Sequence, residues 1–540
     1  RFKCDWSSDV CSSDLLRNIL ESYPRDELFQ VDLDTLLDFS LAILELGERP
    51  RIRVLARRDK FDRFVSLLVY VPRDRYNTDT RLAIGNYLAD AFDGRVSSVY
   101  PAFPEGPLAR VHYIIGRDEG PTPAVAQAEL EAAVARITRN WCDGFADACR
   151  AKFGPARGRK LIELYGRAFP EAYRASYTAE MAVADVTLLE LFVGDRRTAV
   201  DLIGGSLPSP RVSMRLMSLG GPVPLSARVP VLEAMGFTVL EEKTFEIGRS
   251  GETIVLHDMA LRRADGVDVD LSRDVNRLKA LFMAVWLGRA DSDRLNALTL
   301  VAGLGWREIA MLRALARYLG QIGLAHGHDY VAEALVRNAR VATLLVALFS
   351  ARFDPTFAGD RVARLAVLRG ELEAAFREVP ILDDDRILRR LANLIEAATR
   401  TTFFQIGVDG DPHPVMAFKF DAARIDGLPA PRPFAEIWLH APDVEGVHLR
   451  FGKVARGGLR WSDRPEDFRT EILGLVKAQQ VKNAVIVPVG AKGGFVARRI
   501  GADRAAAGVA AYERYVGTLI DLTDNIVDDA VVPPADTVRY

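Results

Sequence analysis

Hydrophobic positions change their spacing several times along the chain, and each change predicts a different kind of element. Residues 16–120 and 196–268 combine short apolar runs with a helical period, which predicts two small α+β units. Through 121–195 and 269–400, apolar residues recur every three or four positions, as in amphipathic helices. Strand-like runs return in 401–540, around glycine-rich segments. The pattern predicts a multidomain fold of the α+β and α/β classes.

The first α+β unit is predicted to be an antiparallel sheet covered by one helix. Its expected strands are residues 51–56, 64–71, 96–100 and 109–115, and its expected helix is 78–92. The second unit repeats this mixture of elements. Its expected strands are 212–218, 237–245 and 252–261, with a helix at 225–235. In the last region, strands are expected at 414–420, 434–439, 447–451 and 484–489, and a helix at 502–522.

The two cysteines of the helical segment bear on the redox compartment. Cys142 and Cys149 fall in a stretch, 121–153, that reads as one helix and places them on one face. They lie too far apart along the helix axis for a disulfide of good geometry. We therefore expect reduced thiols, as in a cytosolic protein.

Composition and charge exclude some classes of protein but do not identify the function. The chain has 540 residues, of which 49% are hydrophobic and 27% charged, as is ordinary for a soluble protein of several domains. A net charge of -2 gives no basic field for nucleic acid or an anionic membrane surface. No apolar run reaches about 18 residues, so no transmembrane helix is expected. No secretory signal is recognisable, and a cytoplasmic location is the expectation.

Residues 1–15 do not read as part of a fold. The run from Asp5 to Leu15, Asp-Trp-Ser-Ser-Asp-Val-Cys-Ser-Ser-Asp-Leu, corresponds to a translated sequencing adapter. We interpret 1–15 as a non-native scar and exclude it from the fold, together with Cys4 and Cys11. The natural N-terminus is expected to be missing.

The strongest candidate chemistry lies in two glycine-rich segments. Arg456 precedes Gly457 and Gly458 in the first expected turn. Lys492 lies in a second expected turn, Val-Gly-Ala-Lys-Gly-Gly, after the apolar strand at 484–489. Glycines on both sides of this lysine remove side chains, which lets a small ligand approach the backbone.

A helical run between the glycine-rich segments ends at Lys482. Gln479 precedes it by three residues, so the two side chains share a helix face. Arg456, Lys482 and Lys492 are thus three cationic groups at spacings that suit a compact dianion. Taken alone, Lys492 would be read as a surface loop lysine, the usual place of a lysine in a glycine-rich turn. A phosphate-binding loop is excluded, because Gly493 stands where that motif requires Ser or Thr.

Two other short motifs are weak evidence for a metal site and for a dinucleotide-binding turn. His326-Gly327-His328 lacks acidic or cysteine partners and reads as an exposed turn rather than a metal site. Gly303-Leu304-Gly305 continues to Trp306 in a helical region and does not complete a Gly-x-Gly-x-x-Gly fingerprint after a strand. We expect neither a metal nor a dinucleotide-binding turn in this sequence.

The segments Lys-Val-Ala-Arg-Gly-Gly-Leu-Arg-Trp-Ser-Asp and Pro-Val-Gly-Ala-Lys-Gly-Gly-Phe resemble the catalytic core of glutamate dehydrogenases, in particular the large NAD-specific bacterial subfamily. The resemblance implies that Lys492 is the catalytic lysine and that Gln479 and Lys482 bind the α-carboxylate. It places Arg456, with the neighbouring Gly457 and Gly458, at the distal carboxylate. It also implies glutamate, 2-oxoglutarate and ammonia as substrates, NAD as cofactor, and a homo-oligomer.

Two further segments carry the same resemblance. The turn Pro533-Pro534-Ala535-Asp536 is similar to the family's turn bearing a catalytic aspartate, which implies that Asp536 shuttles protons; alone, it would read as a solvent-facing carboxylate. The entry from Gly220 to Pro224 and the exit Leu-Glu-Ala-Met-Gly-Phe around the second unit's helix resemble ACT regulatory domains. Amino-acid effector binding and a purely structural role both remain open for that unit.

The resemblance implies a division of the chain into domains. These are a scar (1–15), an ACT-like domain (16–120), a helical linker (121–195), an ACT-like regulatory domain (196–268), a helical region (269–400) and the substrate-binding part of a catalytic domain (401–540). NAD is expected to bind a Rossmann domain that this fragment lacks.

Three functions stay open at this point. The first is NAD-dependent glutamate dehydrogenase, in a fragment expected to be inactive alone. The second is a non-catalytic amino-acid-sensing module of ACT type. The third is a related dehydrogenase for Leu, Phe or Val. Arg456 argues against the third, since an apolar pocket would not favour a buried cation.

Overall fold

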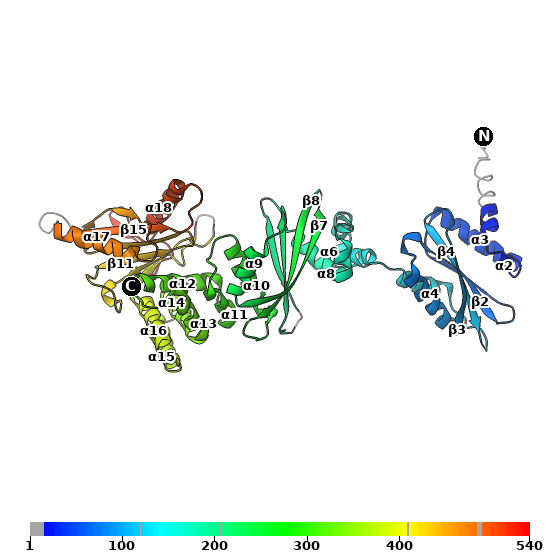
Figure 1. Ribbon diagram of the computed structural model, residues 1–540, viewed down its shortest axis with the longest axis horizontal. Coiled ribbons are helices and arrows are strands. Elements are labelled where there is room, and N and C mark those ends of the chain that lie inside the picture. Colours follow the sequence, from blue (N-terminus) through cyan, green and yellow to red (C-terminus); the bar gives the residue numbers. More distant parts are fainter. Residues whose placement is uncertain (1–15, 119, 205–206, 250, 408–409, 483–488) are drawn as a thin grey trace, which may run out of the picture. The chain divides into compact units, whose positions relative to one another are not determined.

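The computed structural model describes residues 16–118, 120–204, 207–249, 251–407, 410–482 and 489–540 (Figure 1). The adapter-like segment 1–15 lies outside the described residues. The chain divides into two compact units, Arg1–Thr187 and Leu188–Tyr540. Each unit has hydrophobic cores of its own and mixes helices with sheets, which confirms the α+β and α/β fold class.

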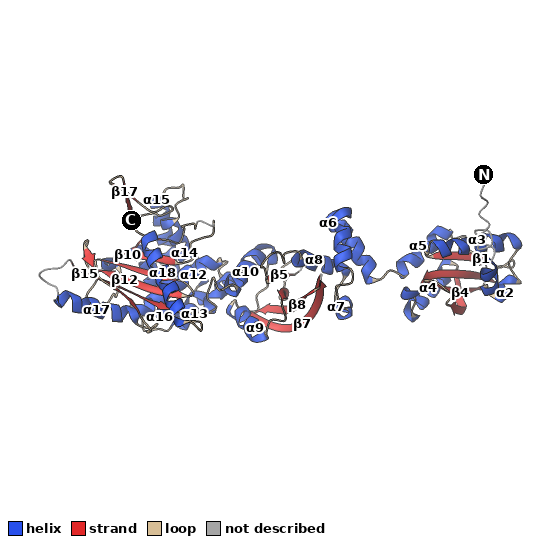
Figure 2. Ribbon diagram, turned by 90° about the horizontal axis from the view of Figure 1, so that it is seen from above, coloured by secondary structure: helices blue, strands red, loops and turns tan. Residues whose placement is uncertain are grey.

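The first unit is built on a four-stranded antiparallel sheet in the order β1-β2-β4-β3. Its strands are β1 (Arg53–Arg58), β2 (Phe64–Pro72), β3 (Gly94–Ala102) and β4 (Leu108–Arg117). Its helices are α2 (Arg25–Leu28), α3 (Leu33–Glu48), α4 (Thr78–Ala91), α5 (Gln127–Ile137), and the short η1 (Arg73–Arg75). Helices α4 and α5 pack on one face through Ile84, Leu88 and Val134, and α3 packs on the other through Ala42 and Leu46 (Figure 2).

Both faces of this sheet are therefore covered, and the prediction of one covering helix is wrong. The reason is visible in β2, where Val65 and Leu67 face the α4 side while Leu68 and Tyr70 face α3. A strand with apolar residues at both odd and even positions must be buried on both of its faces.

A helix cap divides the stretch 121–153 that the sequence predicts as one helix. Helix α5 ends at Ile137, and α6 (Trp141–Tyr165) begins after Asn140. The Asn140 side chain accepts a hydrogen bond from Asp143 N, and the Asp143 carboxylate accepts one from Asn140 N, which is a capping box. Cys142 and Cys149 both lie on α6 as free thiols. The unit continues with α7 (Glu171–Ser176) and α8 (Ala179–Leu189).

The second unit begins with another four-stranded antiparallel sheet, in the order β5-β6-β8-β7. Its strands are β5 (Thr198–Ile203), β6 (Val212–Leu219), β7 (Phe237–Arg249) and β8 (Glu252–Arg263). Helices α9 (Leu225–Ala234) and α10 (Leu271–Trp286) pack against it through Leu232, Leu278 and Leu281. The order matches that of the first sheet, and β5 is a strand that the sequence analysis did not predict.

A helical layer follows, as the recurring apolar positions predict. Its members are α10, η2 (Arg294–Ala297), α11 (Leu298–Val301), α12 (Trp306–Gln321), α13 (His328–Arg337), α14 (Ala339–Phe353), α15 (Arg361–Arg377) and α16 (Leu382–Ala397). Among the described residues, no single helix is long and apolar enough to cross a membrane. Helices α13 and α14 reach that length and hydropathy only as a pair, with a bend of 97° between them.

The last region is a mixed sheet in the order β9-β10-β11-β12-β15-β13, with β14 also paired to β15. Its strands are β9 (Ala398–Thr401), β10 (Met416–Phe420), β11 (Ala435–His440), β12 (Val444–Arg450), β13 (Ala455–Arg456), β14 (Leu459–Trp461) and β15 (Val489–Ala497). Helices α17 (Phe468–Lys482) and α18 (Arg504–Asp521) pack on it, with η3 (Ala422–Arg424) and a small β16–β17 hairpin (Asn525–Val527, Ala530–Val532).

Alternation along the strands assigns each residue to one face of this sheet. Trp438, Leu449 and Val496 join the core beneath α12 and α17, and we call this side the packed face. Leu439 and Phe495 have the opposite parity and pack against α18, which covers part of the other side, the cleft face. In Figure 1 the sheet lies between α18 above and α12 below.

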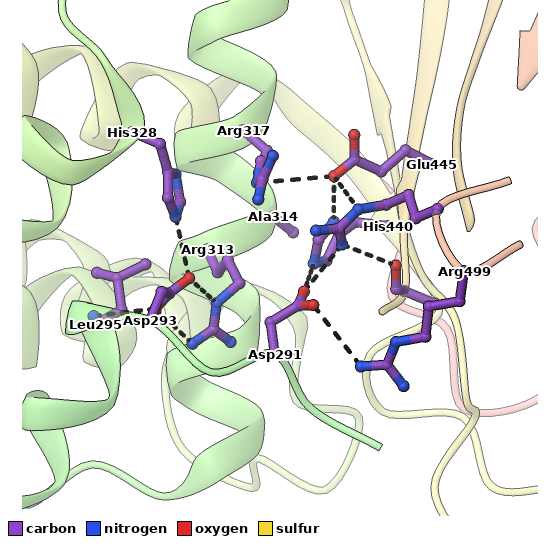
Figure 3. A network of polar contacts seen from close by, with 12 residues as sticks. Asp291, Asp293, Leu295, Arg313, Ala314, Arg317, His328, His440, Glu445 and Arg499 are labelled. Atoms are coloured by element: carbon purple, nitrogen blue, oxygen red, sulfur yellow. Dashed lines mark hydrogen bonds and ion pairs between the residues drawn. The ribbon is translucent and has the colours of Figure 1, made fainter. Parts of the chain in front are cut away.

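A buried polar network ties the helical layer to one end of the sheet (Figure 3). His440, at the end of β11, lies 3.0 Å from Glu445 and 3.4 Å from Asp291, while Arg498 lies 2.9 Å from Asp291. Burial alone would raise the pKa of Glu445, but the hydrogen bond and charge of His440, with Arg498 and Arg317, hold that pKa below its usual range. The network fixes the ends of β11, β12 and β15 against the helical layer.

The same network corrects the interpretation of His326-Gly327-His328. His328 Nε2 lies 3.0 Å from Asp293, whose carboxylate is also paired with Arg313 at 2.7 Å. Burial alone would raise the pKa of Asp293, but the hydrogen bond from His328 and the charge of Arg313 lower it. His328 is thus a structural hydrogen-bonding residue, and the interpretation of an exposed turn is wrong for it.

Candidate functional site

One row of residues crosses the cleft face of the last sheet in register. Strand by strand, the row contains Arg400, Lys419, Ile437, His448, Gly493 and Leu459. Residues directly opposite one another in a sheet project to the same face. Five of these six side-chain positions line one cleft, and the sixth is the glycine.

The cleft that opens over this row has a volume of about 1330 Å³, ample for a small-molecule ligand. Its walls come from α18, the loop around Ile406 and the segment 521–536. Gly457 of the first glycine-rich segment and Asp536 of the Pro-Pro-Ala-Asp turn both line it. Of the described residues, neither Arg456 nor Lys492 is in its lining.

Gly493 and Gly494 are required by crowding on both faces of β15. A Cβ at Gly493 would lie 2.6 Å from Leu459 Cδ2 and closer still to the Tyr515 hydroxyl, which bonds Val447 O at 2.8 Å. A Cβ at Gly494 would meet the side chain of Ile472 on the packed face at 2.5 Å or less. These glycines bring α18 and α17 close to the strand that carries Lys492.

Lys492 lies inside β15, paired with Leu449, so the prediction that it occupies a turn is wrong. Strands β13 and β14 pair with β15 in parallel, so the glycine-rich stretch is part of the sheet. Lys492 and Val496 are an even number of residues apart in β15, so both side chains project to the packed face. Lys492 is only half-buried there. A Cβ at Gly458 would lie 3.8 Å from Lys492 Nζ, so the lysine reaches the first glycine-rich segment.

Gln479 also reaches the first glycine-rich segment. Its Nε2 donates to Arg456 O at 3.0 Å, and a Cβ at Gly490 would lie 3.0 Å from its Oε1. That Oε1 is buried without a hydrogen-bond partner among the described residues. Arg456 itself is exposed at the end of β13, and α17 is described as far as Lys482, where the described residues break off. The predicted strand 484–489 lies outside the described residues except for its last position.

Asp536 lies at the other end of the sheet, next to β9. Gln405 Nε2 donates to Thr537 Oγ1 at 3.0 Å, and Tyr540 N donates to Thr399 O at 3.1 Å, which fixes this segment along β9. Asp536 is exposed, with a backbone φ of 50°. The structure therefore brings Lys492, Gly458, Gln479 and the Arg456 backbone together, while Asp536 lines the cleft with Gly457, on a segment whose end is bonded to β9.

Six family sequence profiles match the chain, each describing a part of a bacterial or related glutamate dehydrogenase. They are glutamate dehydrogenase helical motif 1 (12–49), ACT2 domain (53–142), helical motif 2 (148–191), ACT3 domain (204–273), helical motif 3 (290–355) and bacterial NAD-glutamate dehydrogenase, catalytic domain (371–540). An NAD-specific glutamate dehydrogenase from Halomonas elongata is 41% identical over 97% of this chain and 33% of its own length. The chain belongs to the bacterial NAD-specific glutamate dehydrogenase family.

Other relatives agree with this assignment. NAD-specific glutamate dehydrogenases from Pseudomonas aeruginosa and Mycobacterium tuberculosis are 41% and 36% identical, each over 97% of the chain and 33% and 34% of their own lengths. The chain thus spans about a third of the length of these curated relatives. The resemblance drawn from the two glycine-rich segments is confirmed, and so are the ACT-type domains.

Neither glycine-rich motif among the described residues has the geometry of a dinucleotide-binding turn. Gly303 and Gly305 lie between helices α11 and α12, so no strand precedes them. The cofactor site of Rossmann proteins needs a glycine-rich turn between a parallel strand and a helix N-terminus. The glycines of β15 lie within a strand instead, where they admit helices rather than a pyrophosphate.

Two cleft residues escaped the sequence analysis. His448 and Lys419 are single polar residues inside the apolar strands Val-His-Leu and Phe-Lys-Phe. Once a strand is predicted, a polar residue at a position that projects away from the core can indicate a site residue. Burial, with the nearby Arg450 guanidinium, lowers the pKa of His448 to about 4, so this imidazole is neutral at ordinary pH.

Proposed function

We propose that this chain is part of an enzyme that carries out NAD-dependent oxidative deamination of L-glutamate to 2-oxoglutarate and ammonia. The support is the grouping of Lys492, Gly458 and Gln479 at the first glycine-rich segment, in a chain 41% identical to NAD-specific glutamate dehydrogenases. The reaction needs a proton taken from the 2-amino group, hydride removed from the adjacent carbon, and water added to the resulting iminium.

Each grouped residue has a role in this proposal. Lys492 takes up protons from the amino group and from the attacking water. Gln479 and Lys482 bind the α-carboxylate, and the exposed guanidinium of Arg456 grips the distal carboxylate in a bidentate manner. Gly458 leaves room for the substrate beside Lys492, and Gly457 lets β15 approach, because a Cβ there would collide with Ala491 O. The unpartnered Oε1 of Gln479 is an acceptor available to the substrate's ammonium group.

Asp536 shuttles protons to the substrate nitrogen in this proposal. For that role its turn must approach Lys492 from its present place beside β9. Asp536 and most of the segment 525–536 are exposed, whereas the chain is anchored after it, where Tyr540 bonds Thr399 O and Arg352 O. The proposed movement is confined to the exposed part of the segment, with its anchored end as the fixed point.

NAD, the cofactor of this proposal, accepts the hydride when bound. We place its binding site outside the described residues, in keeping with relatives about three times as long as this chain. We also propose a homo-oligomer in the cytoplasm, with small molecules as its ligands and amino acids as possible effectors of the ACT-type domains. The free thiols of α6 are compatible with a reducing compartment.

The test is an assay of the complete enzyme containing this chain for NADH formation with L-glutamate, norvaline, leucine, phenylalanine and valine. We expect turnover with glutamate far above the rest. Arg456→Met should raise the KM for glutamate much more than for norvaline, which lacks the distal carboxylate. Fastest turnover with an apolar amino acid, or none with any amino acid, would refute the proposed reaction.

A further inference from the structure

Lys419 presents an ammonium group to the cleft. It lies on β10 between Arg400 and Ile437 in the cross-strand row, and it is half-buried. No hydrogen bond or ion pair joins its Nζ to any of the residues that the structure describes. Burial and the neighbouring Arg400 lower its pKa, the Asp524 carboxylate opposes this shift, and Arg450 adds to it. A cation held in such surroundings attracts an anion.

The two arginines near Lys419, Arg400 and Arg450, already have hydrogen-bond partners. Arg400 makes a bidentate pair with Asp524 at 2.8 and 2.9 Å. The Arg450 guanidinium donates to the carbonyls of Gly452, at 3.0 Å, and Lys453, at 2.6 Å. The hydrogen bond from Arg400 keeps the pKa of Asp524 below its usual range, so this carboxylate is committed to Arg400. Lys419 is left as the cation of the row that a ligand can engage.

His448 supplies a second open polar group two strands away. Its ring makes no hydrogen bond with any described residue, yet it lines the same cleft on the same face. The imidazole is neutral and can therefore donate one N–H to a ligand without carrying charge itself. Ile437 lies between the two groups, so an apolar surface separates an ammonium from an imidazole donor.

We propose that Lys419 and His448 form an anion-binding subsite in the cleft, separate from the glutamate site, for the carboxylate or phosphate group of a small metabolite. An ammonium and a neutral N–H donor on one face are the groups that hold an oxyanion. The cleft volume accommodates the remainder of such a ligand, and Ile437, Leu519 and Ile520 offer it apolar contacts.

The position of this subsite separates it from the proposed glutamate site. Lys492 projects to the packed face, whereas Lys419 and His448 project to the cleft face. Lys419 is also three strands from β15, which is roughly 14 Å at about 4.8 Å per strand. The carboxyl carbons of glutamate are only about 5 Å apart when extended, so one glutamate does not bridge Lys492 and Lys419 through the sheet.

The test is calorimetric titration of the 540-residue chain with inorganic phosphate and, separately, with glutarate. Binding of phosphate alone assigns the subsite to a phosphate group, and binding of glutarate alone or of both assigns it to carboxylates or to oxyanions generally. Lys419→Met should raise the Kd of the bound probe at least about tenfold, because a charge-assisted hydrogen bond is lost. His448→Phe should raise it by a smaller factor.

Matched variants keep the result interpretable. Lys453→Met removes an exposed lysine from the rim of the same cleft and should leave the Kd within about twofold. Lys419→Arg keeps the charge and should retain binding, which separates loss of the cation from loss of the fold. The proposal is overturned if neither probe binds at millimolar concentration, or if Lys419→Met binds as tightly as Lys453→Met. Glutarate can also occupy the proposed glutamate site, so only binding that Lys419→Met weakens is assigned to the subsite, and binding that Arg456→Met weakens is assigned to the glutamate site.

Discussion

The two faces of the last sheet are built from the same strands but have opposite characters. On the packed face, Trp438 and Leu449 are fully buried beneath the helical layer, and the charged pair of Arg469 with Glu436 is fully buried too. On the cleft face, Lys419 and His448 remain open to a cavity. Because side chains alternate along a strand, β15 can place Lys492 on one face and a glycine against α18 on the other.

The comparison teaches that neighbouring residues in the glycine-rich segment serve different sides of the molecule. Lys492 belongs with α17 and Gly458, while Gly493 admits Tyr515 and stands beside His448. A one-residue shift of β15 would exchange these roles. The function of the segment therefore depends on its register as much as on its composition.

The largest expected effect is loss of turnover on replacing the half-buried lysine of the packed face. Lys492→Ala in the complete enzyme should lower kcat by about 10²- to 10⁴-fold, because a positioned proton acceptor is removed. Lys477→Ala, an exposed position on α17, is the control and should keep its activity. Steady-state NADH formation measures both. If Lys492→Ala keeps more than half of its turnover, catalysis does not use the packed-face side of β15.

The next effect concerns stability, through the fully buried pair. Arg469 bonds Glu436 at 2.6 and 2.7 Å with neither side chain exposed. Arg469→Met should lower the free energy of unfolding by about 3 to 5 kcal/mol, because Glu436 is left as a buried unpaired charge. Adding Glu436→Leu should restore most of that loss. Chemical denaturation followed by circular dichroism provides the measurement.

The surface pair of Arg464 and Asp467 is the matched control for that experiment. Both side chains are about half exposed, so Arg464→Met should change the free energy of unfolding by no more than about 1 kcal/mol. Equal losses from the buried and the surface arginine would mean that the packed face is more hydrated than the structure indicates.

The smallest expected effect is a pH dependence that originates on the cleft face. The pKa of His448 is about 4 in the folded state, against about 6.5 for an unfolded histidine. Below pH 6.5 the unfolded state therefore binds more protons, and stability falls as pH falls from 6.5 toward 4. The loss from this residue between pH 6.5 and 4.5 should be about 2 kcal/mol. His448→Asn should remove that part of the slope, and an unchanged slope would show that the imidazole is solvated.

Much of the fold follows from local patterns. The expected strands at 64–71, 434–439 and 252–261 and the helix at 502–522 correspond closely to β2, β11, β8 and α18, since each combines apolar periodicity with turn residues at its ends. Pairing partners were not predictable, because register between distant strands depends on tertiary packing that a single sequence does not display.

At the candidate site, local sequence patterns do not predict the structure. Gly-Ala-Lys-Gly-Gly has the composition of a turn, yet it forms the centre of β15, because β12, β13 and β14 pair with it from both sides. Those partners come from other parts of the chain and override the local preference of glycine. Lys419 and His448 become recognisable as site residues only when the row across four strands is known.

One core of buried side chains runs without interruption from Met214 and Leu216 in the second four-stranded sheet, through the helical layer, to Val496 in the last sheet. Regions that are distinct by sequence, including the ACT3 domain and the catalytic domain, therefore share their interior. Cooperativity of unfolding follows contiguous packing rather than evolutionary modules. Residues 188–540 are accordingly expected to melt in a single transition, and a cut between these regions would expose apolar surface on both products.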